Sequence, residues 1–127
     1  MSMVETETEV ERAYQRSVHT PTSQEAQELQ DLLSRRLTAY ISGVKEGRTV
    51  TRWINGDVSE IRHESQQRLQ TAYAIAQLLS RRASVDVIKA WFIGLNPQLG
   101  DVSPAEAIHE GRLQEASAAA RSFIAGS

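Results

Sequence analysis

The side chains best suited to chemistry are six polar residues in the middle of the chain, which fit contacts with DNA: Lys45, Arg48, Thr51, Arg52, Asn55 and Arg62. Those from 48 to 55 are spaced i, i+3, i+4 and i+7, which puts them on one face of a helix. In the major groove, Arg pairs with guanine, Asn pairs with adenine, and Thr offers a hydroxyl or a methyl group. The basic residues at 45, 48 and 62 also suit phosphate contacts, which supply much of the affinity.

A short helix over about residues 48–55 is expected to position this face. Val50, Trp53 and Ile54 lie at i, i+3 and i+4, so they would face the core and leave the polar residues outside. Gly56 directly follows and is typical of a left-handed helix end.

A second short helix over about residues 37–42 is expected just upstream, because Gly43 and Gly47 interrupt the apolar spacing. Val44 would fill the core in the turn. Two short helices joined by a turn, the second with a polar and basic outer face, are typical of a helix-turn-helix. Such units bind DNA or serve only as packing scaffolds, and the pattern alone leaves both open.

The net charge of −2 conceals an uneven distribution. Residues 1–34 carry seven acidic and two basic groups, residues 35–82 carry four and nine, and residues 83–127 carry five and three. The middle of the chain is therefore basic, as expected for a nucleic-acid contact. A solvated helix face would give the same count.

The chain before the helix-turn-helix divides into two stretches. Residues 1–22 contain few apolar groups and are interpreted as a mobile acidic tail, with a helix over residues 9–17 as the alternative. From Ser23, which is the expected N-cap, leucine and alanine recur with helical spacing.

Three more helices are expected after it. The first is a long helix that Ser59 would cap and that would run to about residue 82, with an apolar band broad enough for burial on two sides. A short helix follows Ser84, with Val85, Ile88, Trp91 and Phe92 as core residues. The last, over about residues 113–124, is rich in alanine and suits close packing.

Residues 91–108 combine apolar side chains, turn residues and a helix start, and contain no catalytic side chain. Asn96-Pro97 is expected to fix a turn, and Leu95 is expected to join the core. Ser103 would cap a helix with Pro104 in its first turn and Glu106 completing a capping box. This combination is typical of a docking surface.

Other classes of protein find little support. No nucleophile has a base at suitable spacing, no glycine-rich phosphate loop is present, and the three histidines lack metal-ligand spacing, so we expect neither enzyme activity, a metal nor a cofactor. The absence of cysteine excludes disulfides. No apolar run approaches the roughly 18 residues that span a membrane, and the N-terminus lacks a secretory signal, so we expect a cytoplasmic, all-α protein.

The pattern after residue 90 carries a family resemblance through eleven residues: Trp91, Phe92, Leu95, Asn96, Pro97, Leu99, Gly100, Pro104, Glu106, Ala107 and Ile108. It is similar to the toxin-binding C-terminal motif of the MbcA/ParS/Xre antitoxin family, whose members are partners of RES-domain toxins. The upstream segment AYISGVKEGRTVTRW adds the helix-turn-helix, so the resemblance covers about residues 34–124.

The resemblance implies an antitoxin that binds an NAD-degrading RES-domain toxin, blocks access of its substrate and represses its own operon. It divides the chain into a tail at 1–22, a helix-turn-helix part at 23–82, and a toxin-binding part at 83–127. Toxin contacts are expected at the end of the chain, on seven residues: Glu106, Glu110, Arg112, Leu113, Arg121, Phe123 and Ser127. The sequence alone does not distinguish charged residues that bind the toxin from charged residues that are only exposed to solvent.

Two further expectations concern partners. Helix-turn-helix proteins read paired half-sites through two-fold symmetry, so we expect a homodimer within a larger complex of toxin and antitoxin. The alternative function is a stand-alone helix-turn-helix regulator that binds operator DNA, which leaves residues 91–108 unexplained.

Overall fold

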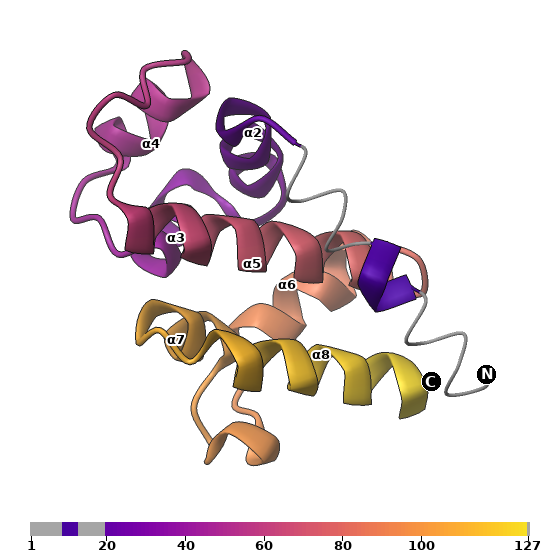
Figure 1. The fold of residues 1–127 in the computed structure, drawn as a ribbon. Coiled ribbons are helices and arrows are strands. Elements are labelled where there is room, and N and C mark those ends of the chain that lie inside the picture. The colour runs from indigo at the N-terminus through magenta and orange to yellow at the C-terminus, as the bar shows by residue number, and fades with distance from the viewer. Residues whose placement is uncertain (1–8, 13–19, 127) are drawn as a thin grey trace.

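Helices make up the fold (Figure 1). The structure is a computed structural model that describes residues 9–12 and 20–126, and within these the expected all-α class is confirmed. The helices are α2 (Thr22–Leu33), α3 (Arg35–Ser42), α4 (Gly47–Ile54), α5 (His63–Leu79), α6 (Val85–Ile93), the 3-10 helix η1 (Pro97–Leu99), α7 (Pro104–His109) and α8 (Leu113–Gly126). None of them, in this described part, has the length and apolar character needed to cross a bilayer.

Helix α5 runs through the middle of the molecule (Figure 1). Helices α2, α3 and α4 pack against one another, and α2 and α3 also contact α5. On the other side of α5 lie α7 and α8, and α7 reaches back to α3. The parts expected at 23–82 and 83–127 therefore share one hydrophobic core.

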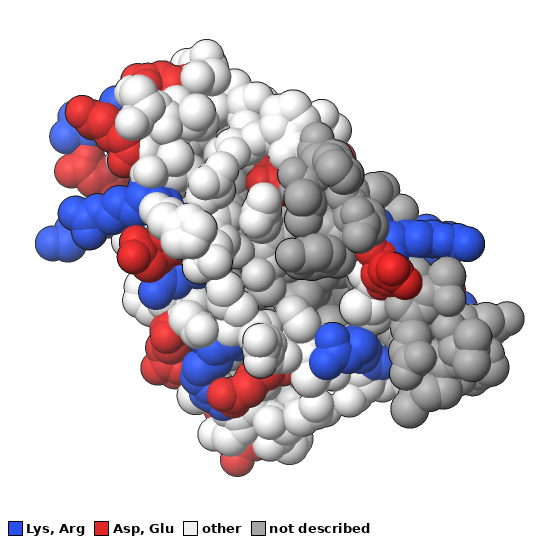
Figure 2. All heavy atoms as spheres, in the orientation of Figure 1, with Lys and Arg blue, Asp and Glu red and all other residues white. Residues whose placement is uncertain are grey.

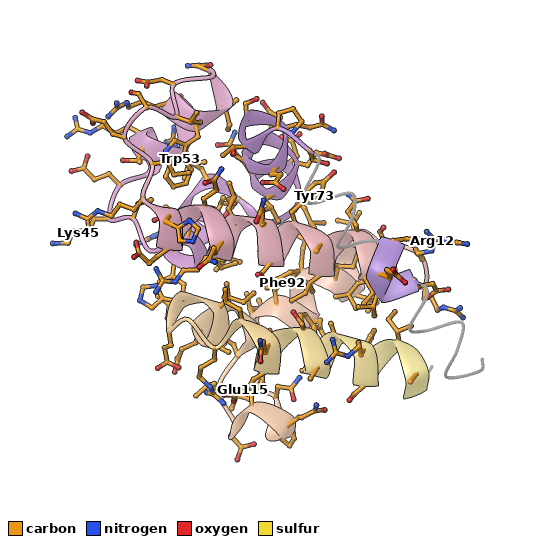
Figure 3. All side chains as sticks on the ribbon, in the orientation of Figure 1. Arg12, Lys45, Trp53, Tyr73, Phe92 and Glu115 are labelled. Carbon is orange, nitrogen blue, oxygen red and sulfur yellow. The ribbon has the colours of Figure 1, made fainter. Side chains whose placement is uncertain are left out.

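That core is built from the apolar stripes of all these helices. Trp53 of α4, Tyr73 of α5 and Phe92 of α6 are buried in it (Figure 3), and so are Leu29 of α2 and Ile124 of α8. The exposed fraction of each of these side chains is 4% or less. Burial on two sides explains the broad apolar band of α5.

The pair α3 and α4 forms where two short helices were expected. Ser34 caps α3 by accepting a hydrogen bond from the Leu37 N–H at 3.1 Å. Gly43 ends α3 in the left-handed region with φ of 85°, and Gly56 has φ of 91° just beyond α4. Glycine adopts these angles without strain, which is why the chain turns at both places.

Two expected caps are wrong. Helix α2 begins one residue before Ser23 without a side-chain cap, because the Pro21 carbonyl accepts the first amide hydrogen bonds instead. Helix α5 begins at His63 and not near Ser59, whose hydroxyl donates to Asp57 Oδ1 at 2.9 Å within the preceding turn. Ser23 thus lies within the first turn of α2, and Ser59 lies in the turn before α5.

The N-terminal expectations fall mostly outside the described residues. Residues 9–12 are helical, and Val10 packs against the core. Arg82 donates a hydrogen bond to Glu9 Oε1 at 2.9 Å, which ties this turn to the end of α5. Where the tail is described, it is therefore anchored, as the helical alternative expected.

Candidate functional site

The outer face of α4 carries the residues expected to contact DNA. Arg48, Arg52 and Asn55 are exposed, and Val50 and Trp53 on the opposite side are buried. This division agrees with the spacing of the sequence. We call these three exposed residues the α4 face.

Thr51 is less free than expected. Its hydroxyl donates to the Gly47 carbonyl at 3.4 Å and accepts from Arg35 Nη1 at 3.5 Å. The side chain is partly buried between these partners. The hydroxyl hydrogen of Thr51 is therefore already used by Gly47, and its oxygen already accepts one hydrogen bond, from Arg35.

Acidic partners hold both arginines of the α4 face. Arg52 donates to Asp57 Oδ2 from Nε and Nη2, at 3.1 and 3.0 Å, and lies 3.4 Å from Glu60. Hydrogen bonds from Ser59 and then from Arg52 lower the pKa of Asp57. Arg48 pairs with Glu46. Figure 2 shows the result as red and blue atoms side by side over this end of the molecule.

The remaining basic residues of the middle segment do not gather on the α4 face. Lys45 lies in the turn between α3 and α4 and extends outward (Figure 3), and Arg62 is exposed just before α5. Arg82, in contrast, lies beyond the far end of α5, paired with Glu9. The positive charge of residues 35–82 is thus spread over several surfaces.

The loop after α6 is held in one shape by Asn96. Its side-chain oxygen accepts from the Gln98 N–H at 2.9 Å, and its backbone oxygen accepts from Leu99 and Asp101 at 2.9 and 3.0 Å. Its own N–H donates to the Val102 carbonyl at 3.0 Å. Asn96 therefore fixes the turn, as the sequence predicted.

A glycine sets one end of this loop, and the expected serine cap sets the other. Gly94 leaves α6 where a Cβ atom would lie 2.9 Å from the Ala90 carbonyl oxygen, so a side chain does not fit. At the other end Ser103 accepts the Glu106 N–H at 3.0 Å and starts α7. Arg112, just before α8, donates to the Leu99 carbonyl at 3.1 Å and ties the loop to that helix.

Apolar side chains around the loop divide between core and surface. Phe92 is fully buried, and Trp91 packs edge-on against it with ring centroids 5.2 Å apart. Leu95, expected in the core, is 76% exposed, and Val85 is 56% exposed, so both of these expectations are wrong. Ile93 is 61% exposed. We call Ile93 and Leu95 the α6 end.

The position of Leu95 has a simple cause. The chain leaves the helix at Gly94, so Leu95 no longer follows the helical spacing that places Phe92 inside. Asn96 then directs the chain into η1, and Leu99 is the loop residue that enters the core. Periodicity cannot predict a side-chain direction beyond the helix that generates it.

The residues expected to bind the toxin lie mainly at the junction of α7 and α8. Arg112 joins Glu115 at 2.6 Å and Glu110 at 3.7 Å, and its hydrogen bond lowers the pKa of Glu115. Glu115, which sequence reasoning missed, thus belongs to the same cluster. Glu106 is partly buried on α7.

The others are spread along α8. Leu113 packs against the core, Phe123 lies with its ring centroid 6.5 Å from that of Trp91, and Arg121 is partly buried. Ser127 lies outside the described residues. The expected set therefore contains one charged cluster and several positions that support the fold.

The structure also brings together two residues that the sequence could not connect. His109 of α7 stacks on Tyr40 of α3 with ring centroids 4.2 Å apart and planes 7° apart. Its Nδ1 lies 2.6 Å from the Tyr40 carbonyl oxygen, which can only accept, so Nδ1 carries the proton. No sequence signal joins positions 69 residues apart.

A scan against protein-family models and searches of curated proteins and of solved structures find no match to this chain. Within residues 9–12 and 20–126, no group of three or more His, Cys, Asp or Glu side chains is arranged to hold a metal ion.

Proposed function

We propose that this protein is an antitoxin that binds and blocks an NAD-degrading RES-domain toxin. The observation that carries the proposal is the ordered loop after α6, which holds Ile93 and Leu95 exposed beside it. Large apolar side chains held on a fixed loop are typical of a docking surface.

The polar residues of the loop favour binding over catalysis. Asn96, Ser103 and Arg112 all use their hydrogen-bonding groups to fix the backbone. None of the three is oriented as part of a nucleophile and base pair. What the loop offers a partner is shape and apolar surface, so we propose a binding protein without activity of its own.

The loop after α6 offers a better toxin contact than α7 does. From the sequence, recognition was expected on α7 and α8. In α7, however, Pro104, Ala105, Ala107 and Ile108 are buried, which leaves little surface for a partner. We therefore propose that the α6 end anchors the toxin and that the charged cluster around Arg112 lies at the rim.

The test is complex formation with a RES-domain protein, sought first among the products of the genes adjacent to this chain's own gene. The native chain is expected to co-elute with it in size-exclusion chromatography. A double variant, Ile93→Asp with Leu95→Asp, is expected to fold normally but to lose the complex, because two charges would be buried without partners. Gln67→Asp, which places a charge on exposed α5 surface, is the matched control.

We further propose that α3 and α4 act as a helix-turn-helix that binds operator DNA. The α4 face supports this proposal because its Arg48, Arg52 and Asn55 are exposed on one side of a helix whose other side is fixed in the core. Binding would exchange the Asp57 partner of Arg52 for a base or phosphate.

The same face favours a second candidate, a regulator that binds DNA and has no toxin partner. The two functions differ in one outcome. A regulator of this kind shifts operator DNA and ignores the RES-domain protein, and the double variant at the α6 end would leave its activity in cells unchanged.

A further inference from the structure

A groove lies over α3, the turn that follows it and the end of α7, away from the loop after α6. Its volume is about 720 Å³, in the range of pockets that hold small ligands. Three basic residues and an aromatic pair line it: Arg35, Arg36, Lys45, Tyr40 and His109. Only Lys45 among these belongs to the proposed DNA contacts.

The three basic side chains of the groove differ from those of the α4 face. Among the described residues, no carboxylate oxygen lies within 4.0 Å of a side-chain nitrogen of Arg35, Arg36 or Lys45, so none of the three forms an ion pair. Arg48 and Arg52, on the next helix, each have an acidic partner. The groove therefore presents positive charge that the fold does not neutralise.

Arg35 is held in place on the groove wall. Its side chain lies so close over Gly47 that a Cβ atom there would be 2.8 Å from Arg35 Nε. Its Nη1 donates to Thr51 at 3.5 Å. Because the guanidinium is already positioned, less side-chain entropy is lost when it binds a ligand.

The aromatic pair forms an apolar wall beside these charges. Tyr40 lines the groove and is 40% exposed although its ring stacks on that of His109. Two carboxylates, Glu106 and Glu110, lie on α7 and at its end, and burial followed by their charges raises the pKa of Tyr40. An anion would therefore sit at the end of the groove formed by α3 and the turn.

We propose that this groove binds a small phosphate-bearing anion of about the size of a mononucleotide. Two arginines and a lysine supply donors for phosphate oxygens, and the Tyr40 wall suits a planar, less polar group. The site joins α3 to α7, so an occupant would contact both halves of the fold. The inference does not depend on the antitoxin proposal.

Phosphate groups also occur in DNA, and the test separates the two sources. Binding to the full chain is measured by isothermal titration calorimetry with ADP, with pyrophosphate, with adenosine, and with a duplex of random sequence. ADP and pyrophosphate are expected to bind saturably and more weakly as salt rises, and adenosine is expected not to bind.

Variants locate the site. Arg36→Gln and Lys45→Gln are each expected to weaken ADP binding about three- to fivefold, which is the effect of losing one exposed charge contact, and the double variant about tenfold. Arg81→Gln removes the same charge at the far end of α5 and is expected to leave ADP binding unchanged. Circular dichroism checks that each variant is folded.

Three results would overturn the proposal. One is the absence of saturable ADP and pyrophosphate binding by the native chain. Another is equal weakening by Arg81→Gln, which would show a general charge effect. The third is duplex binding that depends on Arg36 and Lys45 without any nucleotide binding, which would assign the groove to DNA.

Discussion

Glu25 is a carboxylic acid in the core beside α5. Its side chain is fully buried on α2, and neither carboxyl oxygen has a hydrogen-bond partner. Burial raises its pKa from 4.5 to about 8. The folded protein therefore keeps a proton at Glu25 over a pH range in which the unfolded chain has released it.

This burial predicts that stability falls as the pH rises from about 4.5 to about 8. The contribution of protonated Glu25 is complete below pH 4.5 and is lost as the pH passes the folded-state pKa. The glutamine of Glu25→Gln cannot ionise, so this variant is expected to lose the pH dependence. At pH 8 its free energy of unfolding is expected to be roughly 2–4 kcal/mol higher than that of the native chain.

Urea unfolding at a series of pH values measures this effect. Glu64→Gln, which removes an exposed carboxylate from α5, is the control and should keep the native slope. A native protein whose unfolding free energy stays level between pH 5 and pH 8 would contradict the account of Glu25.

Arg52 and Asp57 give a second prediction for single residues. Arg52→Ala is expected to weaken operator binding by about 1–3 kcal/mol, because a contact to the DNA is lost. Asp57→Asn is expected to strengthen it, because the mutation removes the intramolecular partner that holds Arg52. Gel-shift titrations at fixed salt measure both, and a loss of affinity in Asp57→Asn would contradict the proposed role of the α4 face.

At the scale of elements, the loop after α6 is held by hydrogen bonds that Asn96, Ser103 and Arg112 form. Asn96→Ala removes the cap of η1 and is expected to cost about 1 kcal/mol in stability. It is also expected to weaken toxin binding, because the α6 end is no longer held beside an ordered turn.

The matched control for this prediction is Gln98→Ala, since the Gln98 side chain is exposed in the same loop. Thermal unfolding and the affinity for the toxin are measured on both variants. If Asn96→Ala binds the toxin as tightly as the native chain, the ordered shape of the loop is not what the toxin recognises.

Elements defined by local signals were predictable from the sequence. Ser84 and Ser103 cap α6 and α7 as expected, and Gly56 turns the chain after α4, because each of these contacts joins residues at most a few positions apart. Ser23 and Ser59 show the limit of the same reasoning. A nearby carbonyl or carboxylate offered each segment another hydrogen-bond arrangement.

What the sequence could not predict depends on long-range packing. The stack of Tyr40 on His109, and the groove beside it, arise only when α7 folds back onto α3. The exposure of Leu95 depends on the path of the chain after Gly94. Arg52 and Asp57 are close in sequence, but Asp57 lies in the turn after α4. The helical pattern does not predict the direction of that turn, so it could not predict their ion pair.

At the scale of the whole molecule, the two halves cannot be treated as independent modules. Ala116, Ala120 and Ile124 of α8 are fully buried against the rest of the core. Deleting residues 113–127 is therefore expected to destabilise the entire fold, and not only to remove a toxin contact. Removal of so much buried apolar surface costs several kcal/mol.

A truncated chain that lacks residues 113–127 should show weaker far-UV circular dichroism and should no longer unfold cooperatively. The proposed DNA binding is expected to fall as well, since α3 is packed against α7. A truncation that unfolds as sharply as the full chain would contradict the single shared core. Point substitutions at the α6 end are consequently the better test of toxin recognition.

The central claim is that the chain inhibits a RES-domain toxin through the α6 end. The most direct measurement is NAD consumption by a purified RES-domain toxin, titrated with the native chain and with the Ile93→Asp, Leu95→Asp double variant. The account predicts that the native chain stops NAD consumption near stoichiometric amounts and that the folded double variant does not. Continued NAD consumption at excess native chain would contradict it.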